Sequence, residues 1–263
     1  MTGRVITVTS GKGGVGKTTV TANLSTALAL RGHRVVAIDT DIGLRNLDVV
    51  MGLENRIVYD LVDVVEGRCR LRQALIKDKR LADLYLMPAA QTRDKTAVSP
   101  ADVVRVCTEL RSEFDFILLD SPAGIELGFQ NAVAPADEVL IVTTPEVAAV
   151  RDADRIIGLL EAQEKYEHRL IINRLKPGMV RRGDMLDITD VLEILAVDLL
   201  GVVPEDEQVI VAINRGTPVV LEHDSLAGQA LRNIARRLTG EEVPFMALEE
   251  PGLWQRVLRR FGR

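Results

Sequence analysis

The chain has 263 residues, of which 47% are hydrophobic and only 3% aromatic, with a formal net charge of -5. This length suits one large α/β domain with an aliphatic core, and the acidic balance argues against nucleic-acid binding as the main role. Cys69 and Cys107 have no metal-ligand spacing, which is typical of reduced thiols in a cytosolic protein. We expect no signal peptide, because a strand pattern follows Met1 at once, and no run of about 18 apolar residues that could span a membrane.

Short apolar runs alternate with helical patterns along the chain. The runs expected to form strands are Val5–Thr9, Val35–Ile38, Leu84–Met87, Phe116–Leu119, Val139–Val142, Leu170–Ile172 and Leu199–Val203. They are almost continuously hydrophobic, as expected where helices cover both faces of a parallel sheet. The expected helices are Lys17–Leu30, Ala101–Ser112, Glu146–Gln163, Ile188–Leu195 and Ser225–Leu238. The alternation predicts an α/β fold in a single domain, with a doubly wound, mostly parallel sheet.

A phosphate-binding loop is expected between the first strand and the first helix. The segment from Gly11 to Thr18 fits the pattern G-x-x-x-x-G-K-[ST] without a mismatch. Its glycines let backbone N–H groups curl around phosphate oxygens, and the helix N-terminus adds a partial positive charge. Lys17 should reach the β- and γ-phosphates, and the Thr18 hydroxyl should ligate Mg²⁺. The residues predicted to bind the nucleotide here are Gly11, Lys12, Gly13, Gly14, Val15, Gly16, Lys17, Thr18 and Thr19.

Two of the expected strands end in carboxylates. Asp39 and Asp41 follow the second strand, and Asp120 ends an apolar strand in the Walker B pattern. Carboxylates at strand ends beside a phosphate loop orient water or join the Mg²⁺ shell. Gly124 follows in Ser-Pro-Ala-Gly, where it would let the backbone swing and offer its N–H to the γ-phosphate. The alternative is that these acids only cap the turns that follow the strands.

The chain ends in a basic amphipathic segment. Residues 240–252 contain glycines, prolines and glutamates, so we expect a P-loop domain at 1–239, a linker at 240–252 and a terminal helix at 253–263. On a helix of 100° per residue, the apolar side chains share an arc of about 140° and the four arginines lie outside it. This pattern is typical of a helix in an anionic membrane interface, and docking on the protein's own sheet is the alternative. The side chains expected to enter the membrane are Leu253, Trp254, Val257, Leu258 and Phe261.

Lys12 adds a second lysine to the loop, in Lys-Gly-Gly-Val-Gly-Lys-Thr-Thr. This sequence resembles the deviant Walker A ATPases, the family that includes MinD, ParA and the nitrogenase iron proteins. The resemblance implies that ATP and Mg²⁺ are bound and that Lys12 reaches across an ATP-sandwich homodimer to the partner's nucleotide. It also implies that Asp41 positions the attacking water and that Asp39 supports the Mg²⁺ shell. Catalysis would rest on Lys12, Lys17 and Asp41, and the metal would be held by Thr18, Asp39 and Asp120.

Residues 43–48, Gly-Leu-Arg-Asn-Leu-Asp, together with the basic tail resemble the MinD branch of septum site-determining ATPases more particularly. This resemblance implies that Asn173 and Pro204 lie on segments that enclose the adenine. It also implies that Asp152 and Asp154 lie on a helix that binds a MinC-like division inhibitor and, where one is present, a MinE-like activator. Without the family, the first two residues belong to ordinary strand-end turns, and the two acids are solvated near a helix start.

The resemblance thus implies a cytoplasmic ATPase that dimerises on ATP. It would bind the cytoplasmic face of the inner membrane through its terminal helix and recruit a division inhibitor to control septum placement. A related ATPase of flagellar number or placement is one alternative, against which residues 43–48 count. A DNA-partitioning ParA-like ATPase is another, but the net charge of -5 and the tail count against it, and no specific nucleic acid is expected as a partner. We exclude an iron protein, because no cysteine follows the loop in a position to hold a cluster.

Overall fold

The computed structural model describes residues 3–246, which form an eight-stranded sheet in the order β3-β4-β2-β5-β1-β6-β7-β8. Every strand pair is parallel except β3 with β4, so the predicted doubly wound, mostly parallel sheet is confirmed. The strands are β1 (Arg4–Thr9), β2 (Val35–Asp39), β3 (Ile76–Lys77), β4 (Leu84–Met87), β5 (Phe116–Asp120), β6 (Glu138–Thr143), β7 (His168–Leu175) and β8 (Leu199–Pro204).

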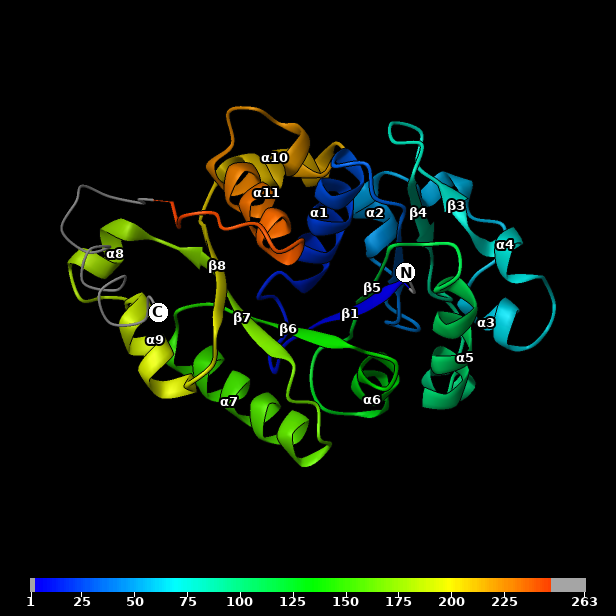
Figure 1. Cartoon of the computed structure of the whole chain (residues 1–263), viewed down its shortest axis with the longest axis horizontal. Helices are drawn as coiled ribbons and strands as arrows, with labels where there is room; N and C mark the ends of the chain where they lie inside the picture. The colour runs from blue at the N-terminus through cyan, green and yellow to red at the C-terminus, as the bar shows by residue number, and fades with distance from the viewer. Residues whose placement is uncertain (1–2, 247–263) are drawn as a thin grey trace.

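Helices cover both faces of this sheet. They are α1 (Lys17–Leu30), α2 (Leu47–Met51), α3 (Leu61–Val65), α4 (Leu71–Ala74), α5 (Pro100–Leu110), α6 (Leu127–Val133), α7 (Val147–Ala162), α8 (Pro177–Arg181), α9 (Ile188–Leu195), α10 (Glu207–Asn214) and α11 (Leu226–Leu238). Figure 1 shows α1, α10 and α11 on one side of the central strands and α6, α7 and α9 on the other. The sheet is therefore the middle layer of three.

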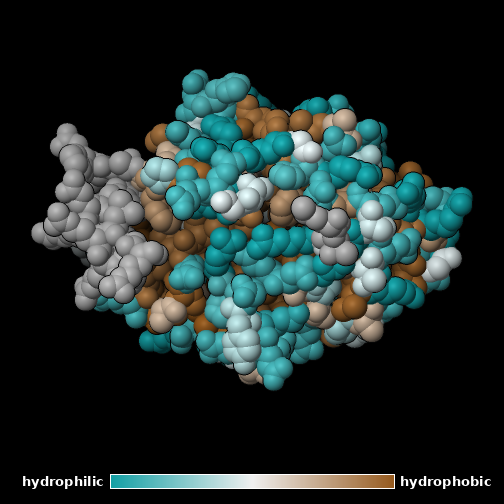
Figure 2. Space-filling model, viewed as in Figure 1, coloured by the Kyte–Doolittle hydropathy of each residue, from teal (hydrophilic) through white to brown (hydrophobic). Residues whose placement is uncertain are grey.

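The core lies between these layers and is mainly aliphatic, as the composition predicts. On one face, Ile6 of β1 and Leu28 of α1 belong to one buried cluster. On the other face, Ile141 of β6 and Ile156 of α7 belong to a second one. Each such side chain stabilises the fold by about 1.5–3 kcal/mol through the removal of apolar surface from water. Figure 2 shows a mostly hydrophilic surface on the face in view, with apolar surface gathered over the β8 edge of the sheet.

The long elements have nearly the bounds that the pattern predicts, whereas several short ones were not predicted. Helix α5 begins one residue earlier than expected because Ser99 accepts a hydrogen bond from the Asp102 N–H and Pro100 occupies the first turn. Helix α10 was not predicted. Ala212 is its one buried residue, so the helix has no buried apolar face to produce a helical pattern in the sequence. Strand β3, with two residues, and helix α6, with seven, are too short to show a periodic pattern of hydrophobic residues.

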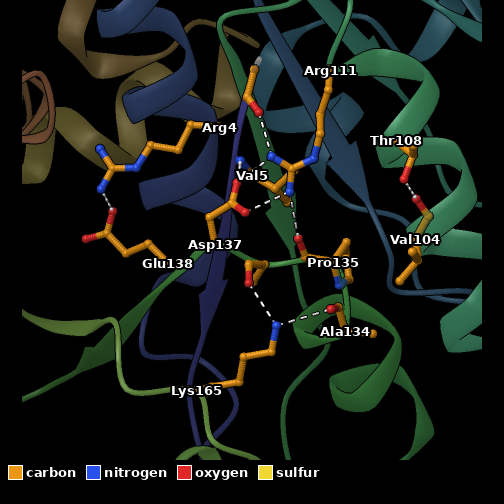
Figure 3. A network of polar contacts seen from close by, with 12 residues as sticks. Arg4, Val5, Val104, Thr108, Arg111, Ala134, Pro135, Asp137, Glu138 and Lys165 are labelled. Atoms are coloured by element: carbon orange, nitrogen blue, oxygen red, sulfur yellow. Dashed lines mark hydrogen bonds and ion pairs between the residues drawn. The ribbon is translucent and has the colours of Figure 1, made fainter. Parts of the chain in front are cut away.

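Charged groups join several elements near the amino-terminal ends of the strands (Figure 3). The phosphate loop lies at the opposite, carboxyl-terminal ends of the strands. The Arg111 guanidinium donates to both oxygens of Asp137, at 2.6 and 2.8 Å, and the Val5 N–H donates to the same carboxylate at 2.8 Å. Burial raises the pKa of Asp137, but these donors outweigh it and hold the pKa below its ordinary value. Nearby, Glu138 is paired with Arg4. These contacts fix β1 against the start of β6.

The last described residues pack on the domain, although they belong to the segment expected to be a linker. Arg237 of α11 donates to the carbonyl oxygens of Val243 and Pro244, and its guanidinium lies 4.3 Å from the centroid of the Phe245 ring. Met246 packs against the core cluster of this face. The boundary at 239 stays a prediction, and the expected helix at 253–263 lies outside the described residues. Within residues 3–246, none of the helices is long and apolar enough to cross a membrane.

Candidate active site

The candidate site lies where three neighbouring strands end. The sheet order places β5 between β2 and β1. Asp120 is paired in register with Asp39 of β2 on one side and with Val8 of β1 on the other. Val8 lies two residues before Ser10, which leads into the phosphate loop. Because parallel strands end at the same edge, the phosphate loop and the carboxylates of both acidic segments meet there. The structure thus brings together the residues that the sequence singled out from three separate segments.

The phosphate loop is held in its curve by backbone conformation and by β7. Gly16 has a φ of 103°, in the left-handed region that glycine adopts without strain. A Cβ at this position would lie 2.3 Å from Nδ2 of Asn173, so a side chain has no room. Asn173 is 7% exposed, and its amide donates to the carbonyl oxygen of Val15 at 2.7 Å. In this structure its amide therefore supports the loop, and its predicted place on a segment that encloses the adenine stays a prediction.

Lys17 lies within the loop rather than in solvent. Its side chain is buried, and Nζ donates to Oγ of Ser10 at 3.0 Å. Burial lowers the pKa of Lys17, and the nearby carboxylates of Asp120 and Asp41 oppose this shift. Ser10 in turn donates to the carbonyl oxygen of Lys12 at 2.8 Å. Sequence reasoning missed Ser10, although a polar residue directly before the first glycine was a usable signal.

Asp120 is deeply buried, at 2% exposure, as is the neighbouring carboxylate of Asp39 at 1%. Burial and the neighbouring Asp39 raise the pKa of Asp120 to about 7, against hydrogen bonds from Thr18 and Thr21 and the charge of Lys17. Thr21 donates from Oγ1 to the carboxylate at 3.1 Å. It was missed, although it lies one helical turn after Thr18 on the same face. A buried acid beside a hydroxyl favours a bound cation, which would keep the carboxylate charged. These residues therefore fit an Mg²⁺ ion.

Asp39 organises the segment that follows β2. One of its oxygens accepts from the Asp41 N–H at 2.9 Å, and the other accepts from the N–H groups of Asn46 and Leu47, each at 3.1 Å. Burial raises the pKa of Asp39 to about 6, opposed by these three donors. Its predicted support of the Mg²⁺ shell is untested. What the contacts show is that Asp39 closes the loop between β2 and α2.

Asp41 lies further out, at intermediate exposure. Burial raises the pKa of Asp41, and the charges of Lys95 and Lys17 oppose the shift. The preceding residue, Thr40, donates from Oγ1 to the backbone carbonyl of Asp120 at 2.7 Å. This bond ties the two acidic segments together. On the second of them, Gly124 has a φ of 91°, and a Cβ there would meet no atom within 4 Å, so this turn lies in open space.

Helix α7 packs directly on the start of the phosphate loop. A Cβ at Gly11 would lie 2.2 Å from the backbone oxygen of Asp152, so only glycine fits this close approach. Lys12 is 44% exposed, and its Nζ lies 3.6 Å from a carboxylate oxygen of Glu146, the residue before α7. Asp152 is half-buried and Asp154 is exposed. The two acids therefore belong to a helix that contacts the loop at Asp152, and their predicted role in partner binding stays a prediction.

The remaining predicted residues lie either away from the phosphate loop and its carboxylates or outside residues 3–246. Pro204 is buried at the end of β8, paired in register with Leu175 at the end of β7. Its predicted role beside the adenine stays a prediction. The five apolar residues expected to enter a membrane lie outside the described residues, so the structure gives no position for them.

Comparison with known proteins identifies the family. The model of the CobQ/CobB/MinD/ParA nucleotide binding domain matches residues 6–219. The septum site-determining protein MinD of Bacillus subtilis is 58% identical over 264 residues, covering 99% of this chain and 98% of its own. The chain belongs to the MinD family. The resemblance seen in residues 43–48 and in the two-lysine loop is thereby confirmed.

Solved MinD structures agree with this assignment. The MinC:MinD cell division protein complex of Aquifex aeolicus contains a chain that is 50% identical with a TM-score of 0.87, covering 93% of this chain and 99% of its own. The septum site-determining protein MinD of Pyrococcus horikoshii, complexed with Mg-ADP, is 32% identical with a TM-score of 0.81. The match covers 89% of this chain and 95% of the Pyrococcus chain. The protein is thus a member of a nucleotide-binding ATPase family with the fold of MinD.

Proposed function

We propose that this MinD family member is an Mg²⁺-dependent ATPase that dimerises on ATP and binds a membrane through its C-terminal segment. The observation that carries the enzymatic part is the buried set at the phosphate loop. Lys17 and Asp120, a cation and a carboxylate, lie together with hydroxyls at the end of three strands. Such a preorganised arrangement of charges suits phosphoryl transfer, in which the protein positions groups and stabilises charge.

The residues of this chain divide the work of hydrolysis. The backbone of the phosphate loop and Lys17 would bind the phosphates, and Thr18 and Asp120 would hold Mg²⁺. The metal, when bound, neutralises charge on the phosphate oxygens. Asp41 lies at intermediate exposure at the edge of the site. From there it would orient the attacking water, and Asp39 would hold the loop that carries it through its three backbone contacts.

Lys12 is placed to act on a second copy of the chain. Its side chain is 44% exposed, and its ion pair with Glu146 at 3.6 Å joins two exposed groups. Exposed ion pairs of this kind contribute about 0–1 kcal/mol, so Lys12 can leave Glu146 at little cost. We infer that Lys12 moves to a nucleotide held by the partner in an ATP-dependent dimer.

Control of septum placement follows from recruitment. An Aquifex aeolicus relative is known in a MinC:MinD complex, and we infer that this chain carries a MinC-like inhibitor in the same way. Asp152 and Asp154 on α7 are the proposed contacts, and a MinE-like activator would bind there too. Because Gly11 packs against Asp152, a change in the loop on nucleotide binding reaches α7 directly. The complex would then assemble on the cytoplasmic face of the membrane, where anionic lipid would attract the arginines of the tail.

Co-sedimentation with anionic liposomes tests this function. The intact chain and a 1–251 truncation are each mixed with vesicles in the presence of ATP or ADP with Mg²⁺. We expect the intact chain to bind with ATP and much less with ADP, because two tails on one dimer raise avidity by about 10²–10⁴. The truncation should stay in the supernatant. Equal binding with ADP and ATP would contradict the nucleotide switch.

A further inference from the structure

Ser10 carries a buried hydroxyl between the two lysines of the phosphate loop. The residue directly follows β1 and is 1% exposed. Its Oγ accepts a hydrogen bond from Nζ of Lys17 at 3.0 Å and donates one to the carbonyl oxygen of Lys12 at 2.8 Å. Burial of a hydroxyl is unfavourable unless its hydrogen-bonding groups find partners. Ser10 satisfies this requirement entirely through the two lysines.

The bond to Lys12 determines how Ser10 can bond to Lys17. A serine hydroxyl has one O–H donor and two lone pairs that accept. Because the O–H of Ser10 is directed at the Lys12 carbonyl, the lone pairs are left for other donors, and Nζ of Lys17 uses one of them. A hydroxyl that donates to a carbonyl also becomes a better acceptor. The Lys12 carbonyl therefore orients the hydroxyl of Ser10 toward the ammonium of Lys17.

The backbone that carries Ser10 is fixed on both sides. The preceding residue, Thr9, is the buried last residue of β1, and its Oγ1 accepts from the Ser121 hydroxyl at 2.9 Å. The following residue, Gly11, packs so closely on the backbone of Asp152 in α7 that a Cβ would lie 2.2 Å from its oxygen. The hydroxyl of Ser10 is therefore held in one place before any nucleotide binds, as preorganisation of a site requires.

The ammonium of Lys17 keeps donors to spare. A lysine Nζ carries three N–H groups. Among the described residues, Ser10 is the one hydrogen-bond acceptor of this Nζ, while Asp120 and Asp41 attract it through their charges. Two N–H groups are thus left for phosphate oxygens. Lys17 can therefore bind phosphate without giving up its bond to Ser10.

We propose that Ser10 is a positioning residue for nucleotide binding, which accepts one N–H of Lys17 and leaves the other two directed at the β- and γ-phosphates. Ser10 itself makes no contact with the nucleotide in this proposal. The inference rests on the phosphate-binding role proposed above for Lys17. A lysine side chain has several rotatable bonds, and ordering them on binding is entropically unfavourable. The bond to Ser10 orders Lys17 beforehand, so less of this loss opposes the binding of phosphate.

A double-mutant cycle tests whether Ser10 acts through Lys17. The affinity for ADP with Mg²⁺ is measured by isothermal titration calorimetry for the intact parent, Ser10→Ala, Lys17→Ala and the variant that carries both substitutions. We expect Ser10→Ala to weaken ADP binding about tenfold in the parent, the effect of losing a hydrogen bond to a charged group. In the Lys17→Ala background the same substitution should change the affinity by about twofold or less, because no ammonium is left to position.

Two further variants serve as controls. Ser10→Thr keeps the hydroxyl and should retain most of the ADP affinity that Ser10→Ala loses. Ser25→Ala is the matched control for the loss of a buried serine hydroxyl. Ser25 lies on α1, is 0% exposed and donates to the carbonyl oxygen of Thr21 at 2.8 Å. We expect Ser25→Ala to leave the ADP affinity unchanged, and circular dichroism checks that every variant is folded.

The outcomes separate this proposal from the function on which it rests. An equal loss of affinity from Ser10→Ala in both backgrounds would show that Ser10 shapes the loop independently of Lys17, and this would overturn the proposal. An unchanged or tighter affinity of Ser10→Ala would overturn it too, since Ser10 would then be idle or would compete with phosphate for Lys17. In these cases Lys17→Ala still weakens ADP binding. An affinity that Lys17→Ala leaves unchanged would instead contradict the role of Lys17 itself, and with it this inference.

Discussion

The two lysines of the phosphate loop lie in unlike surroundings, and this difference supports the unlike roles proposed for them. Lys17 is 8% exposed and donates to Ser10 inside the loop, whereas Lys12 is 44% exposed and faces Glu146 outside it. A cation that is already desolvated and aimed into the loop stabilises phosphate in its own site. A cation on a solvated, extended side chain is available to a neighbouring molecule.

Substitution of each lysine separates these roles. We expect Lys17→Ala to weaken ADP binding by about 10- to 100-fold, because a charge-assisted hydrogen bond contributes about 1.5–3 kcal/mol. Lys12→Ala, the matched control in the same loop, should leave ADP affinity nearly unchanged. Isothermal titration calorimetry with each monomeric variant measures both. A comparable loss of ADP affinity in both variants would contradict the division of roles.

At the scale of elements, one ion pair holds β1 against the start of β6. The Arg111 guanidinium binds Asp137 through two hydrogen bonds, and the carboxylate also accepts from the Val5 N–H (Figure 3). The donors lower the pKa of Asp137 below its ordinary value. The charged carboxylate therefore stabilises the fold above that ordinary value, near pH 4, and this stabilisation is lost as the pH falls through the lowered pKa.

Asp137→Asn tests this contribution. We expect the variant to be about 1–2 kcal/mol less stable than the parent at pH 7, a moderate loss because the pair is partly exposed to solvent. The difference should shrink as the pH falls through the lowered pKa of Asp137, because the parent carboxylate then becomes protonated. Urea unfolding at several pH values measures both free energies, with Glu109→Gln, an exposed acid on α5, as the control. A gap that stays constant with pH would show that ionisation of Asp137 does not matter.

Most of the framework could be predicted from the sequence, because long apolar runs and caps are local signals. Helix α1 and the strand ending in Asp120 follow from patterns within a dozen residues. What could not be predicted depends on contacts between distant segments. Thr40 bonds to the backbone of Asp120, and Gly11 packs against Asp152, and no local pattern shows either contact. The sequence signal identified the chemistry of the site, whereas its connection to α7 required the fold.

At the scale of the whole molecule, three contacts connect the elements around the nucleotide site. Thr40 joins the two acidic segments of the site through its bond to the backbone of Asp120. Gly11 joins the loop to α7, where partners are proposed to bind. Lys12 joins the loop to Glu146, the residue before α7. We propose that a change of nucleotide reaches the partner surface and a second copy of the chain through these contacts.

We propose that ATP joins two copies of this chain through Lys12. Sedimentation velocity of the intact protein with Mg²⁺ measures this directly, with ATP or ADP, for the parent and for Lys12→Ala. We predict a dimer of the parent with ATP, a monomer with ADP, and a monomer of Lys12→Ala with either nucleotide. A parent protein that stays monomeric with ATP, or a Lys12→Ala variant that dimerises as well as the parent, would contradict the claim.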